Sequence, residues 1–410
     1  MICELTAKEF DNYAINHLLA NYYESSNYAT LMSKVGYDKK YIGYKNKHGE
    51  LKAATLLLIK KINHIFKYAY APKGFLVDYN NNDLLEDFTK KLKTYAKKEK
   101  IIFIKLNPEI PTYRYDLKLE KKQLNNYNLI EKLENLGYIH LKDNLYFEAM
   151  LPRFNAVLDL KNYEPSKFNK TNRNKINNAV RKGLEIEVLN DESSIKNLYE
   201  FIEFKKKRRD LVYYKNYFSI FNNDNYVDIF LVKINYQKYL ENSKLVFEKE
   251  EENNEKLTER LFKNNNEDNI KKKMDSDLKL QSYKNDVINA TYNINRDPNK
   301  YIAAAFCIKY LNRVHIVISG FNEMYGHLNP NYFLHNEIFK YYKGKYDYID
   351  LNGITGDFSD TNPYKGLNKF KLGFNPYVYE LIGEFDLVIN EKIYEFLLSI
   401  NSIQKEFKKD

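Results

Sequence analysis

An internal duplication constrains this chain more than any single motif does, because a repeated order of elements sets the architecture. The first copy has an apolar run over 53–59, a short polar turn and a second strand that begins near His64. The second copy repeats this order from Ala303 to Asn312. Residues 59–63 and 308–312 share the pattern Ile-Lys-x-apolar-Asn, which predicts a strand, a tight turn and a returning strand in both places.

Each hairpin is followed by a helical pattern and then by a buried strand. Asparagine-rich N-cap clusters at 80–83 and 329–331 precede the two helices. Their apolar stripes are Leu84, Leu85, Phe88, Leu92 and Tyr95 in the first copy, and Phe333, Leu334, Ile338, Phe339 and Tyr342 in the second. Strand-like runs at 101–108 and 348–353 close the copies. The pattern predicts an α/β layered fold with mixed sheets and two related units packed together.

The division into domains follows from breaks in these patterns. We assign residues 1–150 to the first unit, and the C-terminal segment from about 385 to 410 is a candidate to pack back on it. The linker-like residues 151–153 lead into a strand at 156–160, a helix at 166–182 that ends at Gly183, and a strand at 184–189. We therefore predict a second unit made of 151–234 and 300–384.

Residues 235–299 interrupt the second unit and differ from it, with many charges, sparse apolar positions and almost no Gly or Pro. We predict an antiparallel coiled coil with a turn at 264–266, and the alternative is a disordered charged insertion. The predicted seam consists of Leu240, Phe247, Leu257 and Leu261 on the first arm, and of Ile270, Met274, Leu278 and Ile288 on the returning arm.

Composition limits the class of partner. The 410 residues hold 65 Lys and Arg against 55 Asp and Glu, and a net charge of +10 favours phosphates, nucleic acid or an acidic lipid face. An AT-rich coding sequence would also raise the lysine content. Apolar runs are shorter than the roughly 20 residues of a membrane-spanning helix, and charges at Glu4, Lys8 and Glu9 interrupt any export signal. We expect a cytoplasmic protein.

Sequence motifs exclude several kinds of chemistry. Cys3 and Cys307 have neither disulfide-framework nor zinc-site spacing, so no metal is expected. Walker, GxSxG and GxGxxG patterns are absent from the sequence. The informative residues are basic: the helix at 166–182 carries Arg173, Lys175, Arg181 and Lys182, and a second cluster covers 205–210. A solvated helix face and favourable cations at a helix C-terminus are the structural alternatives.

More specific are two glycines after a strand, Gly353 and Gly356, followed by the step Lys369-Phe370-Lys371-Leu372-Gly373-Phe374. This order predicts a loop that opens at the end of a sheet, where ligands bind in α/β folds, and that presents Lys-Phe-Lys. A surface lysine on a strand is the structural alternative for Lys371.

Over nearly its whole length the chain resembles the Fem family of aminoacyl-tRNA-dependent transferases, which add amino acids to the peptide stem of peptidoglycan precursors. The likeness is carried by residues 70–79 (Tyr-Ala-Pro-Lys-Gly-Phe-Leu-Val-Asp-Tyr), 157–160, 173–183, the Ser319-Gly320 turn with Tyr332 after it, the Gly353 loop and 369–374. It implies two acetyltransferase-like (GNAT-type) domains in tandem, some members carrying a coiled-coil arm in the second.

The resemblance also implies roles for individual residues. Lys371 would stabilise charge at the reacting end of the tRNA, and Phe370 would position the acceptor end. The residues expected to bind the precursor are Lys34, Asn107, Arg209, Tyr214, Lys215, Gly353 and Lys369. Lys215 stands roughly where the family often has arginine, and Asn107 stands where many relatives have aspartate, so Asn107 cannot act as a carboxylate base. Candidates for contacting tRNA are Arg173, Lys175, Arg181, Lys182 and Arg313.

The implied reaction uses aminoacyl-tRNA as co-substrate, no other cofactor and no DNA. Its acceptor is a lipid-linked or nucleotide-linked muropeptide, and a lipid-linked acceptor would place the protein at the inner face of the plasma membrane as a peripheral partner. Glycine, alanine and serine remain open as the transferred residue. Two other functions also remain open: an N-acyltransferase of the acetyl-CoA type, and a non-catalytic tRNA-binding or scaffold protein.

Overall fold

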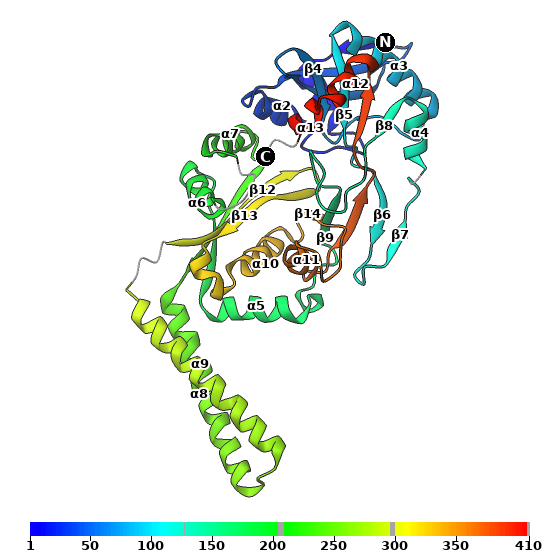
Figure 1. Ribbon diagram of the computed structural model, residues 1–410. Coiled ribbons are helices and arrows are strands. Elements are labelled where there is room, and N and C mark those ends of the chain that lie inside the picture. The colour runs from blue at the N-terminus through cyan, green and yellow to red at the C-terminus, as the bar shows by residue number, and fades with distance from the viewer. Residues whose placement is uncertain (127, 204–208, 296–299, 408–410) are drawn as a thin grey trace.

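The computed structural model describes residues 1–126, 128–203, 209–295 and 300–407. Two mixed sheets with helices on their faces form two adjoining units, and a pair of long helices projects from the second unit (Figure 1). Within the described residues, no helix is both long and apolar enough to cross a membrane.

The first sheet has seven strands within the described residues. Their order is β1 (Ile2–Glu4), β2 (Asp38–Lys45), β3 (Leu51–Ile62), β4 (Phe66–Ala71), β5 (Ile101–Leu106), β16 (Phe385–Val388) and β8 (Tyr138–His140). The helices of this unit are α1 (Ala7–Ala14), α2 (Ser26–Ser33), α3 (Asn82–Lys98), α4 (Leu129–Asn135), α12 (Glu391–Ser399) and α13 (Ser402–Phe407). The side chains of α3 that are buried include Leu85, Phe88 and Leu92, which confirms the predicted apolar stripe.

The second sheet has nine strands within the described part of the chain. Their order is β10 (Leu184–Val188), β11 (Val227–Ile234), β12 (Tyr301–Tyr310), β13 (Arg313–Phe321), β14 (Tyr348–Ile354), β9 (Phe154–Asp159), β15 (Tyr377–Leu381), β6 (Pro111–Tyr115) and β7 (Lys121–Gln123). Its α-helices are α5 (Lys170–Arg181), α6 (Glu192–Ile202), α7 (Leu211–Asn222), α10 (Pro330–Tyr342) and α11 (Lys365–Leu372), and short 3₁₀ turns lie at Pro165–Lys167 and Glu323–Leu328.

The duplication is present as predicted. β3, β4, α3 and β5 repeat as β12, β13, α10 and β14, and in each copy the strand after the helix pairs in parallel with the second strand of the hairpin. In the second copy this pairing covers only three residues and ends at His315 and Asp350. Beyond that pair, β13 and β14 separate.

Within the described residues the chain crosses between the two sheets four times, so a boundary near residue 150 does not separate them. β6 and β7 lie within 1–150 but join the second sheet through β15, and β16 returns to the first sheet between β5 and β8. The ammonium group of Lys105 on β5 lies 2.8 Å from the carboxylate of Asp386 on β16, and both side chains are almost fully buried. Pairing across sequence-distant strands, which local patterns do not encode, decides this arrangement.

The inserted segment folds as a helical hairpin of α8 (Tyr236–Lys263) and α9 (Glu267–Asn293), defined here as the arm (Figure 1). Leu240 and Leu257 of α8 are buried, as expected. The predicted seam on α9 is wrong, because Ile270, Met274, Leu278 and Ile288 are 40 to 71% exposed. Ser276, Asp286 and Ala290 are buried instead, because small or hydrogen-bonding side chains let α9 approach α8 closely.

Two further local predictions need correction or fall outside the described residues. The expected turn at Ser319 and Gly320 is part of β13. A Cβ on Gly320 would lie 2.3 Å from the carbonyl oxygen of Phe201, so this glycine permits the close approach of α6 rather than a turn. Of the basic cluster predicted at 205–210, residues 205–208 lie outside the described residues.

Candidate functional site

A cavity of about 760 Å³ opens in the second unit where β13 and β14 separate. Residues 316–321 of β13 and 351–353 of β14 line it, and α10 and α11 contribute His335, Phe370 and Lys371. Two strands that part within a sheet leave backbone donors and acceptors facing the gap, where a ligand can bind them. We call this cavity the β13–β14 cavity.

Lys371 and Gly353 meet at the wall of this cavity, as the sequence predicted for residues of one site. Only 9% of Lys371 is exposed, and its ammonium nitrogen donates a hydrogen bond to the carbonyl oxygen of Gly353 at 2.6 Å. A largely desolvated cation interacts strongly with negative charge that develops beside it. The pair therefore gives the cavity a fixed positive charge.

Phe370 is held by a cluster of aromatic rings. Its ring meets the rings of Tyr332 and His335 edge-on, at centroid distances of 4.9 Å each, and lies 5.2 Å from Phe374. Lys175 of α5 donates to the hydroxyl group of Tyr332 at 2.9 Å. Since two rings of α10 and the ring of Phe374, which follows α11, surround it, Phe370 presents a fixed apolar surface to the cavity.

The segment with Lys369, Phe370 and Lys371 is the helix α11, not the predicted loop. The side chain of Asn368 explains its position, because it accepts from the backbone nitrogen of Thr355 at 3.1 Å and donates to the Thr355 hydroxyl group at 2.8 Å. These bonds tie α11 to the end of β14. Sequence reasoning missed Thr355 and Asn368, although amide and hydroxyl side chains close to a strand end are a usable signal.

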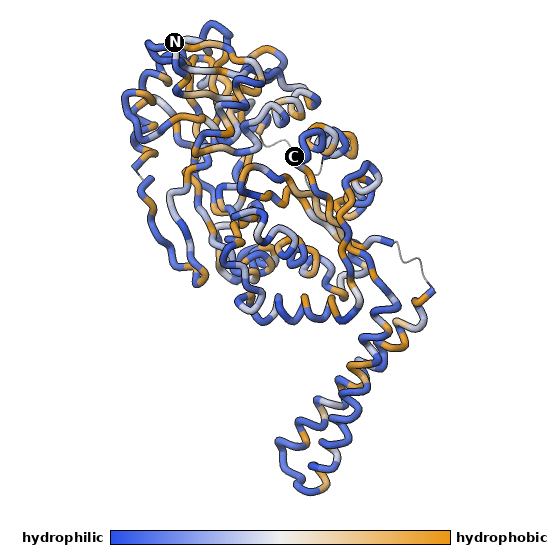
Figure 2. Tube along the Cα trace, turned by 180° about the vertical axis from the view of Figure 1, so that it is seen from behind, coloured by the Kyte–Doolittle hydropathy of each residue, from blue (hydrophilic) through white to orange (hydrophobic). Residues whose placement is uncertain are grey.

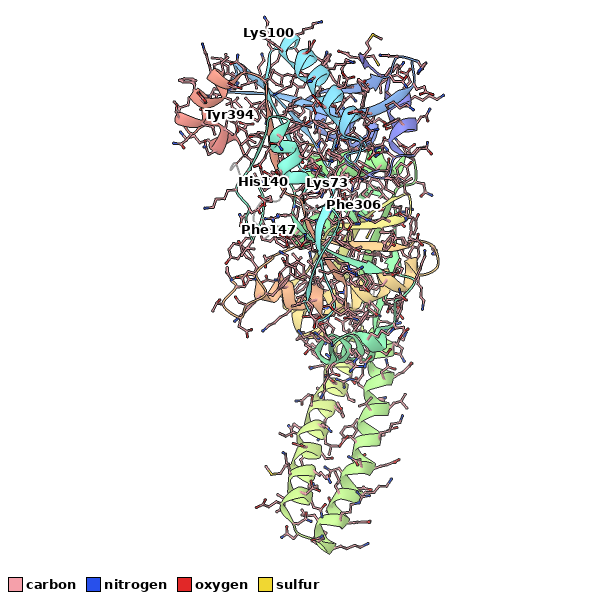
Figure 3. The ribbon with its side chains drawn as sticks, turned by 90° about the vertical axis from the view of Figure 1, so that its right-hand side faces the viewer. Lys73, Lys100, His140, Phe147, Phe306 and Tyr394 are labelled. Carbon is pink, nitrogen blue, oxygen red and sulfur yellow. The ribbon has the colours of Figure 1, made fainter. Side chains whose placement is uncertain are left out.

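The segment that connects the two units, residues 141–152, borders the same cavity, with Phe147 labelled in Figure 3. The ring of Phe147 lies 5.1 Å from that of Tyr364, and a Cβ on Gly353 would lie 2.5 Å from the ring of Pro152. Burial, together with the nearby Glu384 carboxylate, raises the pKa of Glu148 in this segment to about 7. These contacts join the connecting segment to the site.

A polar cluster lies between the units at the point where β13 and β14 begin to separate. Arg313 forms an ion pair with Glu109 at 2.6 Å, and His315 Nδ1 lies 3.4 Å from the carboxylate of Asp350. Burial acts to raise the pKa of Asp350, but His315 and Arg313 outweigh it and lower that pKa to about 2. The ion pair of Arg313 joins the two units, which gives this predicted tRNA-binding residue a structural role.

The residues predicted to bind the precursor are spread over several elements. Lys34 lies at the exposed end of α2, which packs against α7, and Arg209 precedes α7 with its guanidinium group 5.8 Å from the ring of Tyr213. Tyr214 of α7 is buried, and Lys215 forms an ion pair with Glu192 at 2.5 Å. α2 and α7 thus bring Lys34 and Arg209 to neighbouring elements, whereas Tyr214 and Lys215 already have partners.

Asn107 and Lys369 also have structural partners. Asn107 is buried at the end of β5, where its side-chain oxygen accepts from the hydroxyl group of Tyr70 at 3.0 Å and from the backbone of Lys73 at 3.1 Å. Lys369 is exposed and lies 2.9 Å from the carboxylate of Asp360. Neither side chain lines the β13–β14 cavity.

The predicted tRNA-binding residues of α5 do not act as one free basic face. Arg181 and Lys182 lie 2.9 and 3.2 Å from the carboxylate of Asp286, so they hold the base of the arm. Arg173 donates to the carbonyl oxygen of Ser166, and its side chain is exposed. Of the four, Lys175 is the one that contacts the ring cluster around Phe370.

The fold matches a known architecture. The crystal structure of FemX superimposes with a TM-score of 0.73 and 19% sequence identity, covering 97% of this chain and 99% of that one. At this identity the likeness establishes the fold.

The chain belongs to the FemAB family, whose model matches residues 5–401. It is 27% identical to the aminoacyltransferase FemA of Staphylococcus epidermidis, over 98% of this chain and 99% of the relative. It is 25% identical to the lipid II:glycine glycyltransferase of the same species, over 96% of this chain and 94% of the relative. The family predicted from the motifs is confirmed.

Proposed function

We propose that this protein is a transferase that moves an amino acid from an aminoacyl-tRNA to an amine of a peptidoglycan-precursor stem peptide, and so builds the interpeptide bridge. The observation that carries the proposal is the Lys371–Gly353 contact in a cavity at a split parallel strand pair. Relatives named as aminoacyltransferase and as lipid II:glycine glycyltransferase support the same reaction class.

The chemistry asks for positioning and charge stabilisation rather than for a strong nucleophile. The acceptor amine forms a bond to the ester carbonyl carbon, the ester C–O bond breaks, and the tRNA hydroxyl group leaves with the proton that the amine gives up. Negative charge gathers on the carbonyl oxygen before that bond breaks, and the ammonium group of Lys371 would stabilise it. Phe370 would hold the acceptor end of the tRNA against its ring.

Glycine is the amino acid we propose first, with alanine and serine as alternatives, because one relative is named for glycine transfer to lipid II. A lipid-linked acceptor would bring the protein to the cytoplasmic face of the plasma membrane. Lys34 and Arg209, on neighbouring elements, are the proposed contacts for a diphosphate. The net charge of +10 would favour both the precursor and tRNA.

Two finer structural assignments belong to the same proposal. Each unit would be an acetyltransferase-like domain, since each contains a hairpin, a helix and a parallel strand in that order. The arm would be an antiparallel coiled coil, with Leu240 and Leu257 of α8 in its seam.

The test is a transfer assay with a lipid-linked stem-pentapeptide precursor and tRNA charged with radiolabelled glycine, alanine or serine. Free amino acids and acetyl-CoA serve as donor controls. Label should enter the precursor only from charged tRNA, and Lys371→Met should lower kcat by roughly 10²- to 10³-fold, the effect of removing one charge-stabilising donor. Lys365→Met, on the same helix but exposed and without a predicted role in the site, is the matched control and should stay within about threefold of the parent, the scale of a surface change.

Each alternative outcome has a defined meaning. Full activity of the Lys371→Met variant would refute the role of Lys371. Transfer from acetyl-CoA would identify an N-acetyltransferase. If a folded protein bound tRNA but transferred nothing from any pool, it would be a non-catalytic binding protein.

A further inference from the structure

The arm carries an exposed apolar stripe along α9. Ile270, Met274, Leu278, Ile288 and Tyr292 are 40, 61, 71, 56 and 79% exposed. At 3.6 residues per turn these positions fall within an arc of about 80° on one side of the helix. The stripe thus runs along almost the whole length of α9.

This stripe faces away from α8. The buried residues of α9, Ser276, Asp286 and Ala290, centre about 160° from it around the helix axis. The arm extends well clear of the two sheets, with apolar residues recurring among hydrophilic ones along it (Figures 1 and 2). The side of α9 that the hairpin covers therefore carries small or hydrogen-bonding residues, and the larger apolar side chains of the stripe lie on the uncovered side.

The stripe is symmetric about Gln281. Met274 and Ile288 lie seven residues to either side, and Ile270 and Tyr292 lie eleven residues to either side. Leu278 and Lys284 lie three residues to either side, so in a symmetric pair of helices Leu278 of one helix would pack against the aliphatic part of Lys284 of the other. Two copies of a helix related by a two-fold axis and running antiparallel need such a palindrome, because position +n of one meets position −n of the other.

We propose that α9 pairs antiparallel with α9 of a second copy of this chain, with the two-fold axis at Gln281. Met274 then packs against Ile288 of the second copy, and Ile270 packs against Tyr292 of the second copy. A polar side chain at a central position of a helix–helix seam specifies how the helices align and how many of them associate. Gln281 occupies the central position of this seam.

The charges of the arm favour a second copy over an anionic surface. α8 and α9 together carry 12 Asp and Glu against 11 Lys and Arg, so they lack the excess of cations that an acidic bilayer or RNA would need. In the proposed register Asp277 comes within one residue of Lys284 of the second copy, and symmetry forms this pair twice. With the arms antiparallel, the tip of each arm lies beside the base of the other, so the two globular parts sit at opposite ends.

A cysteine at the axis tests the register directly. Gln281→Cys should form an intermolecular disulfide in the full-length protein under mild oxidation, because the two Cβ atoms face each other there. Asp275→Cys, on the same helix but outside the stripe, is the matched control and should stay monomeric on a non-reducing gel. The parent chain, in which Cys307 is buried, reports the background from the native thiols.

Association without a crosslink gives the second readout. The parent protein should sediment as a concentration-dependent dimer, and Met274→Glu with Ile288→Glu should sediment as a monomer with an unchanged circular dichroism spectrum. A parent protein that stays monomeric at about 100 μM, where even weak interfaces associate, would overturn the proposal. So would equal crosslinking at 275 and 281, or a dimer that survives the double substitution. None of these results depends on whether aminoacyl transfer occurs.

Discussion

The buried ion pair between Lys105 and Asp386 should control whether the C-terminal strand stays in the first sheet. Lys105 is 2% exposed and Asp386 is 1% exposed, and their charged atoms lie 2.8 Å apart. The carboxylate also accepts from the hydroxyl group of Tyr394 at 2.7 Å. Replacing Lys105 by methionine removes the cation and leaves Asp386 buried with that single donor.

The expected cost is large, because an unpaired buried charge is far less stable than a pair. Removing one partner of a buried ion pair lowers the free energy of unfolding by about 3 to 5 kcal/mol. Because Asp386 keeps its hydrogen bond from Tyr394, we expect the lower value, about 3 kcal/mol. For a unit of this size such a loss lowers the midpoint of thermal unfolding by roughly 6 to 12 °C. Lys61→Met, an exposed lysine of the same sheet, should change the free energy of unfolding by less than about 0.5 kcal/mol.

Circular dichroism is the suitable measurement, because the chain lacks tryptophan. A double-mutant cycle with Asp386→Asn, which keeps an acceptor for Tyr394, isolates the pair. We expect a coupling free energy of about 1 to 3 kcal/mol. If Lys105→Met shifted the midpoint no more than Lys61→Met, or if the two substitutions were additive, the ion pair would not stabilise the return of β16, and the reasoning would be refuted.

Two further predictions concern the site. The pKa of Glu148 is raised to about 7 from its usual 4.5, so the contribution of this residue to the free energy of unfolding is fully present below about pH 4.5 and is lost as the pH rises through 7. Thermal melts at pH 5 and pH 8 should therefore differ less for Glu148→Gln than for the parent protein. An unchanged pH dependence in this variant would contradict the assignment. Gly353→Ala places a Cβ 2.5 Å from Pro152, so chemical denaturation should show a free energy of unfolding lowered by about 1 to 3 kcal/mol, and transfer should be reduced. Gly366→Ala on α11 places its Cβ in open space and should be tolerated. Equal behaviour of the two variants would argue against the tight Gly353–Pro152 contact.

The local elements of the fold could be read from the sequence because each is encoded by neighbouring residues. Asn81 caps α3 through its side chain, as the asparagine cluster predicted, and Gly183 follows α5 with a positive φ of 72°. The duplication was visible for the same reason. The family followed from motifs spread over the whole chain, and the family model confirms it.

The candidate site was predictable in part. Phe370, Lys371 and Gly353 were chosen from the sequence, and they meet in one cavity. Thr355 and Asn368 were missed although they are only 13 residues apart and their signal, amide and hydroxyl side chains close to a strand end, was present in the sequence. Pro152 was missed because its role depends on a contact with Gly353, about 200 residues away in the chain. The same limit explains Arg181 and Lys182, whose charges looked free in sequence and are bound to Asp286 in space.

The sequence by itself determined the repeated order of hairpin, helix and strand, the helical hairpin inserted in the second unit, and the choice of Gly353, Phe370 and Lys371 for the site. These properties depend on periodicity, caps and turns, which act over a few residues. Only the tertiary structure decided that β6 and β7 join the second sheet, that β16 returns to the first, and that α9 turns its larger apolar side chains outward. Such choices depend on which distant surfaces pack most closely and which buried charges find partners, and local patterns contain neither.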